Sequence, residues 1–375
     1  MNFTFKGYVR NDGTAGTRNY VGIVPSVICS STVVKKISDQ IPTTVPFTHA
    51  NGCAQLGDDL KLTKNMLRGV SLNPNLYATL LVGLGCETNQ IGGLMKQIPK
   101  TKPIKSVQIQ QLAGGKNTIE KGAEIVKKWS EEAKQLKRED LPLSQLTIGI
   151  INIDLEVEDF KTLGPVLGET VDSLINKNAK VVIGLSETLE PAGGPLADRT
   201  DDNLAKRKLI DMSTGLQRLR WGTNPSKTVT DKQLFSEEQT DRAILEAQIT
   251  GTESIKGLLS YGEIPQENGL YLMNTTNNVV ESLSKMTSSG CNIILLLSNR
   301  GILTGASSVP SMLITPDQNS EIFNDLIDHR VKRNDVVNQS KKLMNKLLSI
   351  ASGEQTNLEK LELGEFSIPH VGTTY

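Results

Sequence analysis

Apolar and polar residues alternate along the first third of the chain in blocks that predict strands and helices in turn. Short apolar runs predict strands at 20–25, 45–48, 79–84 and 106–112. Helical patterns lie between them, in a segment carrying Val33, Val34 and Ile37 and over 58–70, 89–98 and 118–136. The uninterrupted run at 79–84 is typical of a strand covered on both faces, as in a parallel sheet.

The same alternation returns after a charged stretch at 135–145, which predicts a linker. Strands are predicted at 146–152, 180–185 and 291–297, and helices at 160–176, 277–287 and 336–351. Prolines and glycines predict a loop over 187–200, and the weakly patterned residues 221–236 predict irregular structure. We therefore expect an α/β fold with two Rossmann-like domains, 1–140 and 141–375, each a mainly parallel sheet flanked by helices.

Composition narrows the classes of function. Lys plus Arg and Asp plus Glu both number 41, so the formal net charge is zero and no global field attracts a nucleic acid. No apolar run approaches the roughly 20 residues that cross a bilayer, and the first residues do not resemble a signal peptide. We expect a cytoplasmic protein without a membrane partner. Four cysteines in 375 residues are too few for a disulfide framework.

Three loops that follow predicted strands each carry a thiol. Cys29 follows the first strand, Cys53 follows the second together with His49, and Cys86 follows the third together with Glu87. Parallel sheets place ligands at the carboxyl ends of their strands, so we expect these loops to converge. Thiolates with an imidazole suit iron or zinc, and an adjacent carboxylate suits a catalytic divalent metal.

Each of these residues also has a structural interpretation. A cysteine in an apolar stretch is more often a buried small side chain, which is the favoured interpretation for Cys29 and for Cys291. For His49 a structural role and a functional role are equally favoured. Arg10, Asp12 and Arg18 precede the first strand and could clamp a carboxylate, or form an ordinary surface turn with ion pairs.

These loops together resemble the altronate and galactarate dehydratase family, in its large subunit or domain. The matching stretches are GYVRNDGTAGTRNY at 7–20, Pro25 with Cys29, HANGCAQLGDD at 49–59, NPN at 73–75, GLGCETNQ at 83–90 and QLAGG at 111–115. The resemblance is fainter in the second half, through LSETLE at 185–190 and NRG at 299–301, followed by Gly305 and Pro310.

The second half also departs from the family pattern. An acidic Cys-Gly-Gly-Ser-Asp segment of the family is replaced by INIDLE at 151–156, and a later Gly-rich segment is lost between Asn224 and Gly257. The Thr-Gly-Arg-Gly-Thr segment of the family becomes SNRGI at 298–302. These departures bear on substrate specificity and on whether activity is kept.

The resemblance implies a carbon–oxygen lyase that dehydrates a 2,3-dihydroxy sugar acid to a 2-keto-3-deoxy acid. It implies a divalent metal, Fe(II) or else Mn or Mg, held by His49, Cys53 and Cys86. The catalytic residues expected on the same basis are His49, Glu87 and Arg18. Substrate contacts are expected from Arg10, Asp12, Asn19, Asn51, Gln55, Asn89 and Arg300.

The resemblance also implies a partner, because split members of the family carry a separate small subunit of about a hundred residues; we expect such a chain here, and a homo-oligomer. Two alternatives stay open. One is a C–S lyase on the same scaffold, releasing sulfite from a sulfonated hydroxy acid. The other is a non-catalytic family member that kept the fold of the first domain.

Overall fold

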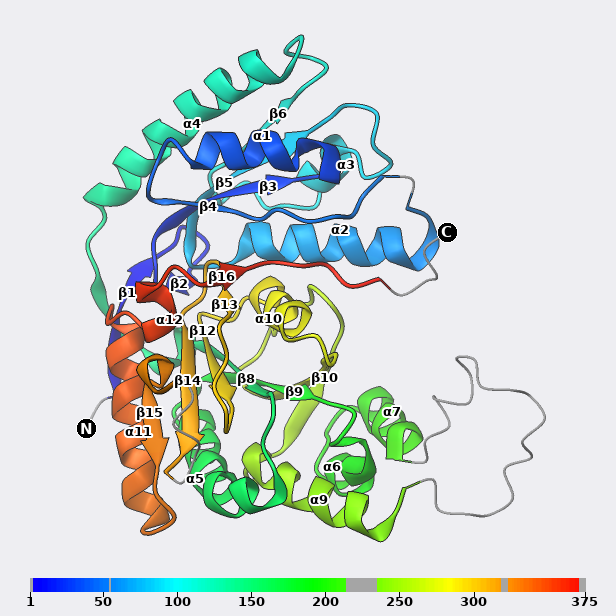
Figure 1. The fold of residues 1–375 in the computed structure, drawn as a ribbon, viewed down its shortest axis with the longest axis vertical. Coiled ribbons are helices and arrows are strands. Elements are labelled where there is room, and N and C mark those ends of the chain that lie inside the picture. The colour runs from blue at the N-terminus through cyan, green and yellow to red at the C-terminus, as the bar shows by residue number, and fades with distance from the viewer. Residues whose placement is uncertain (1–2, 54, 214–234, 318–322, 371–375) are drawn as a thin grey trace, which may run out of the picture.

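A computed structural model describes residues 3–53, 55–213, 235–317 and 323–370 and shows an α/β fold with two parallel sheets (Figure 1). The first sheet has the order β4-β3-β5-β6. Its strands are β3 (Tyr20–Pro25), β4 (Thr44–Pro46), β5 (Leu76–Gly83) and β6 (Ile104–Gln108). The predicted strand at 106–112 therefore ends early, because residues 109–113 turn toward the next helix.

Helices cover both faces of the first sheet. On one face, α1 (Ile28–Ser38) and α4 (Gly115–Gln135) pack Val34, Ile37 and Val126 against alternate residues of β3 and β5. On the other face lie α2 (Gly57–Leu72) and α3 (Ile91–Met95). Because both faces are covered, the two inner strands β3 and β5 are almost entirely buried and mainly apolar, as the pattern at 79–84 predicted, whereas the edge strand β6 carries exposed polar residues.

The second sheet has seven parallel strands in the order β10-β11-β9-β8-β12-β14-β15. They are β8 (Thr147–Asn152), β9 (Lys180–Leu185), β10 (Ile255–Leu259), β11 (Gly269–Asn274), β12 (Ile293–Leu297), β14 (Ser311–Pro316) and β15 (His329–Val331). One face packs against α5 (Val157–Ile175), α9 (Glu237–Ala247) and α11 (Val336–Ala351). The other face packs against α10 (Val279–Ser288) and α12 (Asn357–Lys360). The α/β fold with parallel sheets flanked by helices is confirmed.

Short strands connect the two parts of the chain. β1 (Thr4–Val9) pairs antiparallel with β2 (Ala15–Gly16) and with β7 (Glu139–Pro142). The stretch 135–145, predicted to be a linker, has regular structure of its own, because β7 and a 3-10 turn at Leu143–Gln145 lie within it. β13 (Gly305–Ala306) pairs with β16 (Gly364–Glu365) near the other end of the chain.

A prediction that failed is the loop over 187–200. The structure has a 3-10 turn at Glu190–Ala192 and α6 (Gly193–Asp198), followed by α7 (Asn203–Ser213). Pro195 is tolerated because it lies in the first turn of α6, where a backbone N–H has no helical acceptor to lose. The irregular structure predicted at 221–236 falls almost entirely outside the described residues.

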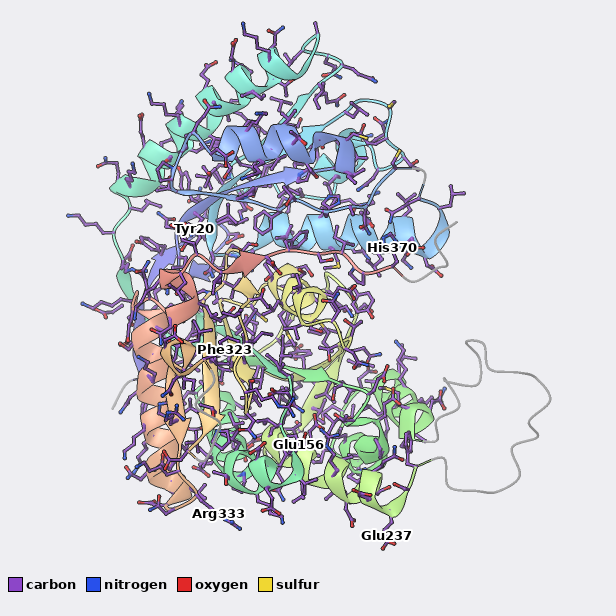
Figure 2. All side chains as sticks on the ribbon, viewed as in Figure 1. Tyr20, Glu156, Glu237, Phe323, Arg333 and His370 are labelled. Atoms are coloured by element: carbon purple, nitrogen blue, oxygen red, sulfur yellow. The ribbon has the colours of Figure 1, made fainter. Side chains whose placement is uncertain are left out.

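The two sheets meet at their amino ends. The side chains of Thr17 and Asn75, which precede β3 and β5, both donate to the carbonyl of Asn292, which precedes β12. The C-terminal segment then runs between α2 and α10, and Figure 2 places His370 beside α2. Along it, Phe366 contacts Phe47 edge-on at 5.3 Å between ring centroids, and the backbone N–H of Ser367 donates to the Ser284 hydroxyl. The described helices include none that is both long and apolar enough to cross a membrane.

Candidate functional site

The carboxyl edge of the first sheet carries the loops that the sequence singled out. Cys29 lies in the first turn of α1 after β3, His49 and Cys53 follow β4, and Cys86 and Glu87 follow β5. β3 pairs with both β4 and β5, so the three loops leave neighbouring strands. Cys29, Cys53 and Cys86 are all exposed, whereas Cys291 is buried in the core. The buried interpretation was therefore right for Cys291 and wrong for Cys29.

Glu87 is the buried acid of this edge, with only 4% of its surface exposed. Its Oε1 accepts a hydrogen bond of 2.6 Å from the Ser26 hydroxyl, and its Oε2 accepts one of 2.6 Å from the backbone N–H of Gly85. A Cβ on Gly83 would lie 2.6 Å from Glu87 Oε1, so only glycine allows the carboxylate this close to β5. The loop therefore holds Glu87 in one fixed position.

His49 is buried, and both of its ring nitrogens contact the backbone. Nε2 lies 2.9 Å from the carbonyl of Pro25, and Nδ1 accepts from the backbone N–H of Asn51 at 3.1 Å. These partners require a proton on Nε2 and none on Nδ1. Burial also lowers the pKa of His49, which favours the neutral ring. In this geometry the imidazole fastens the loop after β4 to the end of β3, and its predicted catalytic role requires one of these bonds to break.

Amide side chains in the same loops differ in their partners. The Asn51 side chain donates to the carbonyl of Ile368 at 3.3 Å, which ties the loop to the C-terminal segment. The side-chain N–H₂ of Asn89 and both polar atoms of the Gln55 amide are shielded from solvent and have no hydrogen-bond partner among the described residues. Buried amides without partners cost free energy, so Gln55 and Asn89 are the best candidates here for ligand contacts.

The predicted metal ligands do not form a metal site as they stand. Within the described part of the chain, no group of three or more His, Cys, Asp or Glu side chains could hold a metal ion. Both nitrogens of His49 and both oxygens of Glu87 already have hydrogen-bond partners. The metal assignment stays a prediction, and no chemical step below relies on it.

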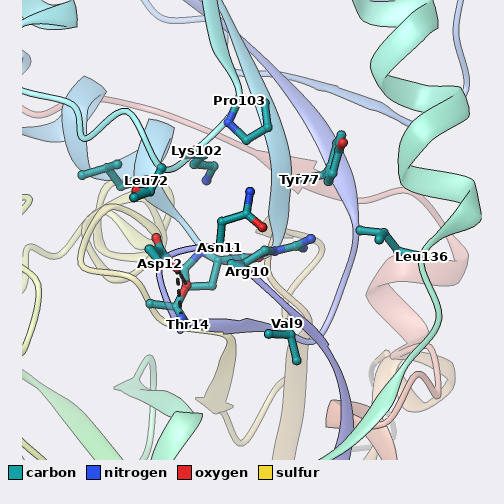
Figure 3. A pocket seen from close by; sticks show the side chains of 12 residues that line it. Val9, Arg10, Asn11, Asp12, Thr14, Leu72, Tyr77, Lys102, Pro103 and Leu136 are labelled. Atoms are coloured by element: carbon teal, nitrogen blue, oxygen red, sulfur yellow. Dashed lines mark hydrogen bonds between the residues drawn. The ribbon is translucent and has the colours of Figure 1, made fainter.

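Other predicted substrate contacts lie away from this edge. Arg10 and Asp12 lie in the loop between β1 and β2 and line a small pocket beside the amino ends of β5 and β6 (Figure 3). The side-chain oxygen of Asn19 accepts a hydrogen bond from Arg10, and its side-chain N–H₂ donates to the carbonyl of Ala133. The Asn19 amide therefore links the loop after β1 to the last turn of α4.

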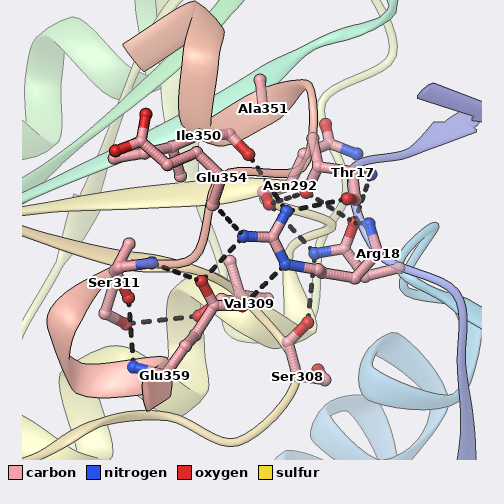
Figure 4. A network of polar contacts seen from close by, with 12 residues as sticks. Thr17, Arg18, Asn292, Ser308, Val309, Ser311, Ile350, Ala351, Glu354 and Glu359 are labelled. Atoms are coloured by element: carbon pink, nitrogen blue, oxygen red, sulfur yellow. Dashed lines mark hydrogen bonds and ion pairs between the residues drawn. The ribbon is translucent and has the colours of Figure 1, made fainter. Parts of the chain in front are cut away.

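Arg18 makes a structural ion pair with Glu359 (Figure 4). Its Nε and Nη2 donate to the two oxygens of that carboxylate at 2.6 and 2.7 Å. Its remaining N–H groups donate to three backbone carbonyls, those of Thr17, Ile350 and Glu354. All five donors of the guanidinium are thus used within the chain. In this geometry Arg18 has no donor left for the substrate carboxylate that it was predicted to contact, so that role stays a prediction that would require one of these bonds to break.

Arg300 is exposed and follows the carboxyl end of β12. The amino end of β12 contacts the first domain through Asn292, so its carboxyl end points away from that domain. The structure therefore divides the predicted site residues among three places: the carboxyl edge of the first sheet, the amino end of that sheet with Arg10 and Arg18, and the loop after β12 with Arg300. Sequence reasoning also missed Ser26, although a hydroxyl directly after β3 could have suggested a partner for Glu87.

Two family models match successive parts of the chain. Residues 7–134 match the family model described as "D-galactarate dehydratase/Altronate hydrolase, second domain". Residues 162–374 match the model "D-galactarate/Altronate dehydratase, C-terminal".

Curated relatives are similar over most of the chain. An altronate dehydratase of Bacillus subtilis is 29% identical over 399 aligned residues, which cover 100% of this chain and 79% of the relative. An altronate dehydratase of Escherichia coli is 28% identical, over 84% of this chain and 66% of the relative. The (2R)-sulfolactate sulfo-lyase subunit beta of Chromohalobacter salexigens is 25% identical, over 97% of this chain and 96% of that subunit.

Proposed function

The chain belongs to the D-galactarate/altronate dehydratase family, and on that basis we propose that it is the large, catalytic component of a hydro-lyase. Its substrate would be a 2,3-dihydroxy sugar acid and its product a 2-keto-3-deoxy acid. The observation that carries the proposal is the fixed, buried Glu87 carboxylate beside exposed thiols and unpartnered amides at a carboxyl edge of a parallel sheet.

The chemical problem in such a dehydration is to remove a proton next to a carboxylate and to protonate the departing hydroxide. We assign the proton transfer to Glu87, because it is the buried acid of the edge and its position is set by Ser26 and Gly85. A carboxylate held in this way contributes a factor of roughly 10² to 10⁴ as a general acid or base. Gln55 and Asn89 would hold the hydroxyl or carboxylate groups of the substrate.

The test is to measure keto-acid formation from altronate and galactarate with wild type and Glu87→Gln. The variant should lower kcat by roughly 10² to 10⁴ while leaving the melting temperature close to wild type, since an amide can still accept from Gly85. Glu124→Gln makes the same substitution at an exposed side chain of α4 and should keep wild-type rates. Equal rates for Glu87→Gln and wild type would rule out this role for Glu87.

A divalent metal at Cys53 and Cys86 remains part of the proposal. Because the described side chains do not form a three-ligand group, such an ion would need further ligands from substrate or a partner chain. Metal content of purified wild type should include Fe(II), Mn or Mg, and Cys53→Ala and Cys86→Ala should lose it, while Cys29→Ala should retain it. Unchanged metal in both variants would reject the assignment.

A second candidate function is C–S cleavage of a sulfonated hydroxy acid. It is favoured by one observation, that this chain aligns with 96% of a relative named as the beta subunit of a sulfo-lyase. The same relative supports a separate small subunit, which we propose as the partner. The small subunit can be sought in the neighbouring reading frame. Assays of this chain with that subunit added should detect either keto acid or sulfite as the product. If neither forms, the chain is the non-catalytic member of the family and the enzyme proposal fails.

A further inference from the structure

A small pocket lies at the amino edge of the first sheet, on the opposite side from Glu87. Its volume is about 170 Å³, and residues from four segments line it, including Arg10, Asp12, Tyr77, Lys102, Pro103 and Leu136 (Figure 3). The segments are the loop after β1, the stretch that leads into β5, the residues just before β6, and Leu136, which follows the last residue of α4. β5 runs eight residues from this edge to the loop of Glu87, a length of roughly 25 Å at about 3.3 Å per residue.

Two cations of the pocket contact only neutral acceptors. Arg10 donates to the carbonyls of Pro74 at 2.7 Å and Arg18 at 2.9 Å, and to the side-chain oxygen of Asn19 at 2.6 Å. Lys102 Nζ donates to the carbonyl of Asn73 at 2.6 Å. Across the described residues, neither cation lies within 4.0 Å of a carboxylate oxygen in an ion pair.

Burial makes both charges costly. It lowers the pKa of Arg10 to about 10, and it lowers the pKa of Lys102 well below its usual value, with the charge of Arg10 adding to the effect. An anion placed between the two side chains would offset this cost, because a nearby opposite charge favours the charged form of each.

Asp12 supplies only part of that charge, because it raises the pKa of both cations by less than burial lowers it. It lies at the exposed rim, where its Oδ1 accepts from the backbone N–H and the hydroxyl of Thr14 at 3.0 and 2.7 Å. Its carboxylate is thus held by its own turn. With Asp12 counted, the pocket lining still has one more positive than negative charge.

We propose that this pocket binds a small organic carboxylate, with Arg10 and Lys102 as its charged donors. The volume fits a ligand of roughly six to eight non-hydrogen atoms, since an apolar cavity of about 150 Å³ admits benzene. Leu72, Pro103 and Leu136 supply apolar walls, which favour an organic acid over an inorganic anion. The site is separate from the edge that carries Glu87, and it does not depend on the function proposed above.

Ligand binding should stabilise the folded chain, because the pocket is built from segments far apart in sequence and therefore exists only in the folded state. The direct measurement is calorimetric titration with malonate and succinate, accompanied by thermal melting at the same concentrations. Succinamide serves as the neutral analogue of succinate, and inorganic phosphate serves as an anion without a carbon chain. Succinate or malonate should bind and raise the melting temperature, whereas succinamide should not.

Variants of the lining identify the site. Lys102→Gln should weaken binding by about tenfold or more, since it removes a charge-assisted hydrogen bond. Lys102→Arg should keep most of the affinity, which separates loss of charge from a folding defect. Asp12→Asn should tighten binding by about two- to fivefold by removing the negative charge at the rim. Lys100→Gln, an exposed lysine nearby, is the matched control and should bind as wild type does.

Three results would overturn the proposal. They are wild-type affinity in Lys102→Gln, equal binding of succinamide and succinate, and the absence of binding by both acids. Phosphate binding as tight as that of succinate would overturn the choice of an organic acid.

Discussion

Polar side chains at the junction of the two sheets differ from those at the carboxyl edge of the first sheet. At the junction, Arg18 uses all five N–H groups within the chain, and Asn75 and Asn292 join the amino ends of the sheets. At the carboxyl edge, the Gln55 amide and the Asn89 N–H₂ lack partners, and three thiols are exposed. Asparagine side chains therefore hold the two sheets together in one region and are available to a ligand in the other, and their hydrogen-bond partners separate the two uses.

The largest effect expected from this comparison is the loss of the Arg18 ion pair. Arg18→Met should lower the free energy of unfolding by about 3 to 5 kcal/mol, because it leaves the largely buried Glu359 carboxylate without its counter-ion and removes three hydrogen bonds to backbone carbonyls. Urea unfolding measures the change. Lys35→Met, which breaks the exposed pair with Asp39, should cost less than about 0.5 kcal/mol. Similar losses in both variants would contradict a structural role for Arg18.

A smaller loss of stability is expected at the carboxyl edge, together with a loss of function. In Gly83→Ala the new Cβ would approach Ile91 Cδ1 to 2.5 Å and Glu87 Oε1 to 2.6 Å, so these side chains must move. We expect a cost of about 1 to 3 kcal/mol in unfolding free energy, and a lower kcat because Glu87 shifts. Gly194→Ala is the matched control, since nothing lies within 4 Å of its new Cβ. A wild-type kcat in Gly83→Ala would show that catalysis does not depend on the position of Glu87.

The smallest expected effect is on the pH dependence of stability, and it concerns His49 at the carboxyl edge of the first sheet. Burial lowers the pKa of His49, so the unfolded chain takes up a proton at pH values where the folded chain keeps the ring neutral. This contribution to stability is present above the unfolded pKa of about 6.5 and is lost as pH falls toward the lowered folded pKa.

Urea unfolding between pH 7.5 and 5.5 tests this sign. The stability of wild type should fall more steeply with acidification than that of His49→Gln, by up to about 1.4 kcal/mol per pH unit. His370→Gln, a substitution in the C-terminal segment, controls for the general effect of removing a histidine. Equal slopes for wild type and His49→Gln would mean that the loop after β4 does not depend on a neutral ring.

The strands of the first sheet and several long helices could be predicted because their apolar patterns are local. The helix predicted at 336–351 matches α11, since its apolar residues recur at helical spacing. The loop predicted at 187–200 was wrong because its prolines and glycines were taken as signs of a loop. In the structure, α6 accommodates Pro195 in its first turn. Glu87 and His49 could be proposed from position alone, as polar residues directly after predicted strands.

The sequence by itself determined the α/β class, the family and the loops in which a site would lie, because these depend on residue patterns within short stretches. Only the tertiary structure decided which polar residues are free to bind a ligand. Arg18 finds Glu359 at a separation of 341 residues, and Arg10 meets Lys102 in a pocket between segments some 90 residues apart. Such partners are brought together by packing of the sheets and helices, and no local pattern in the chain specifies them.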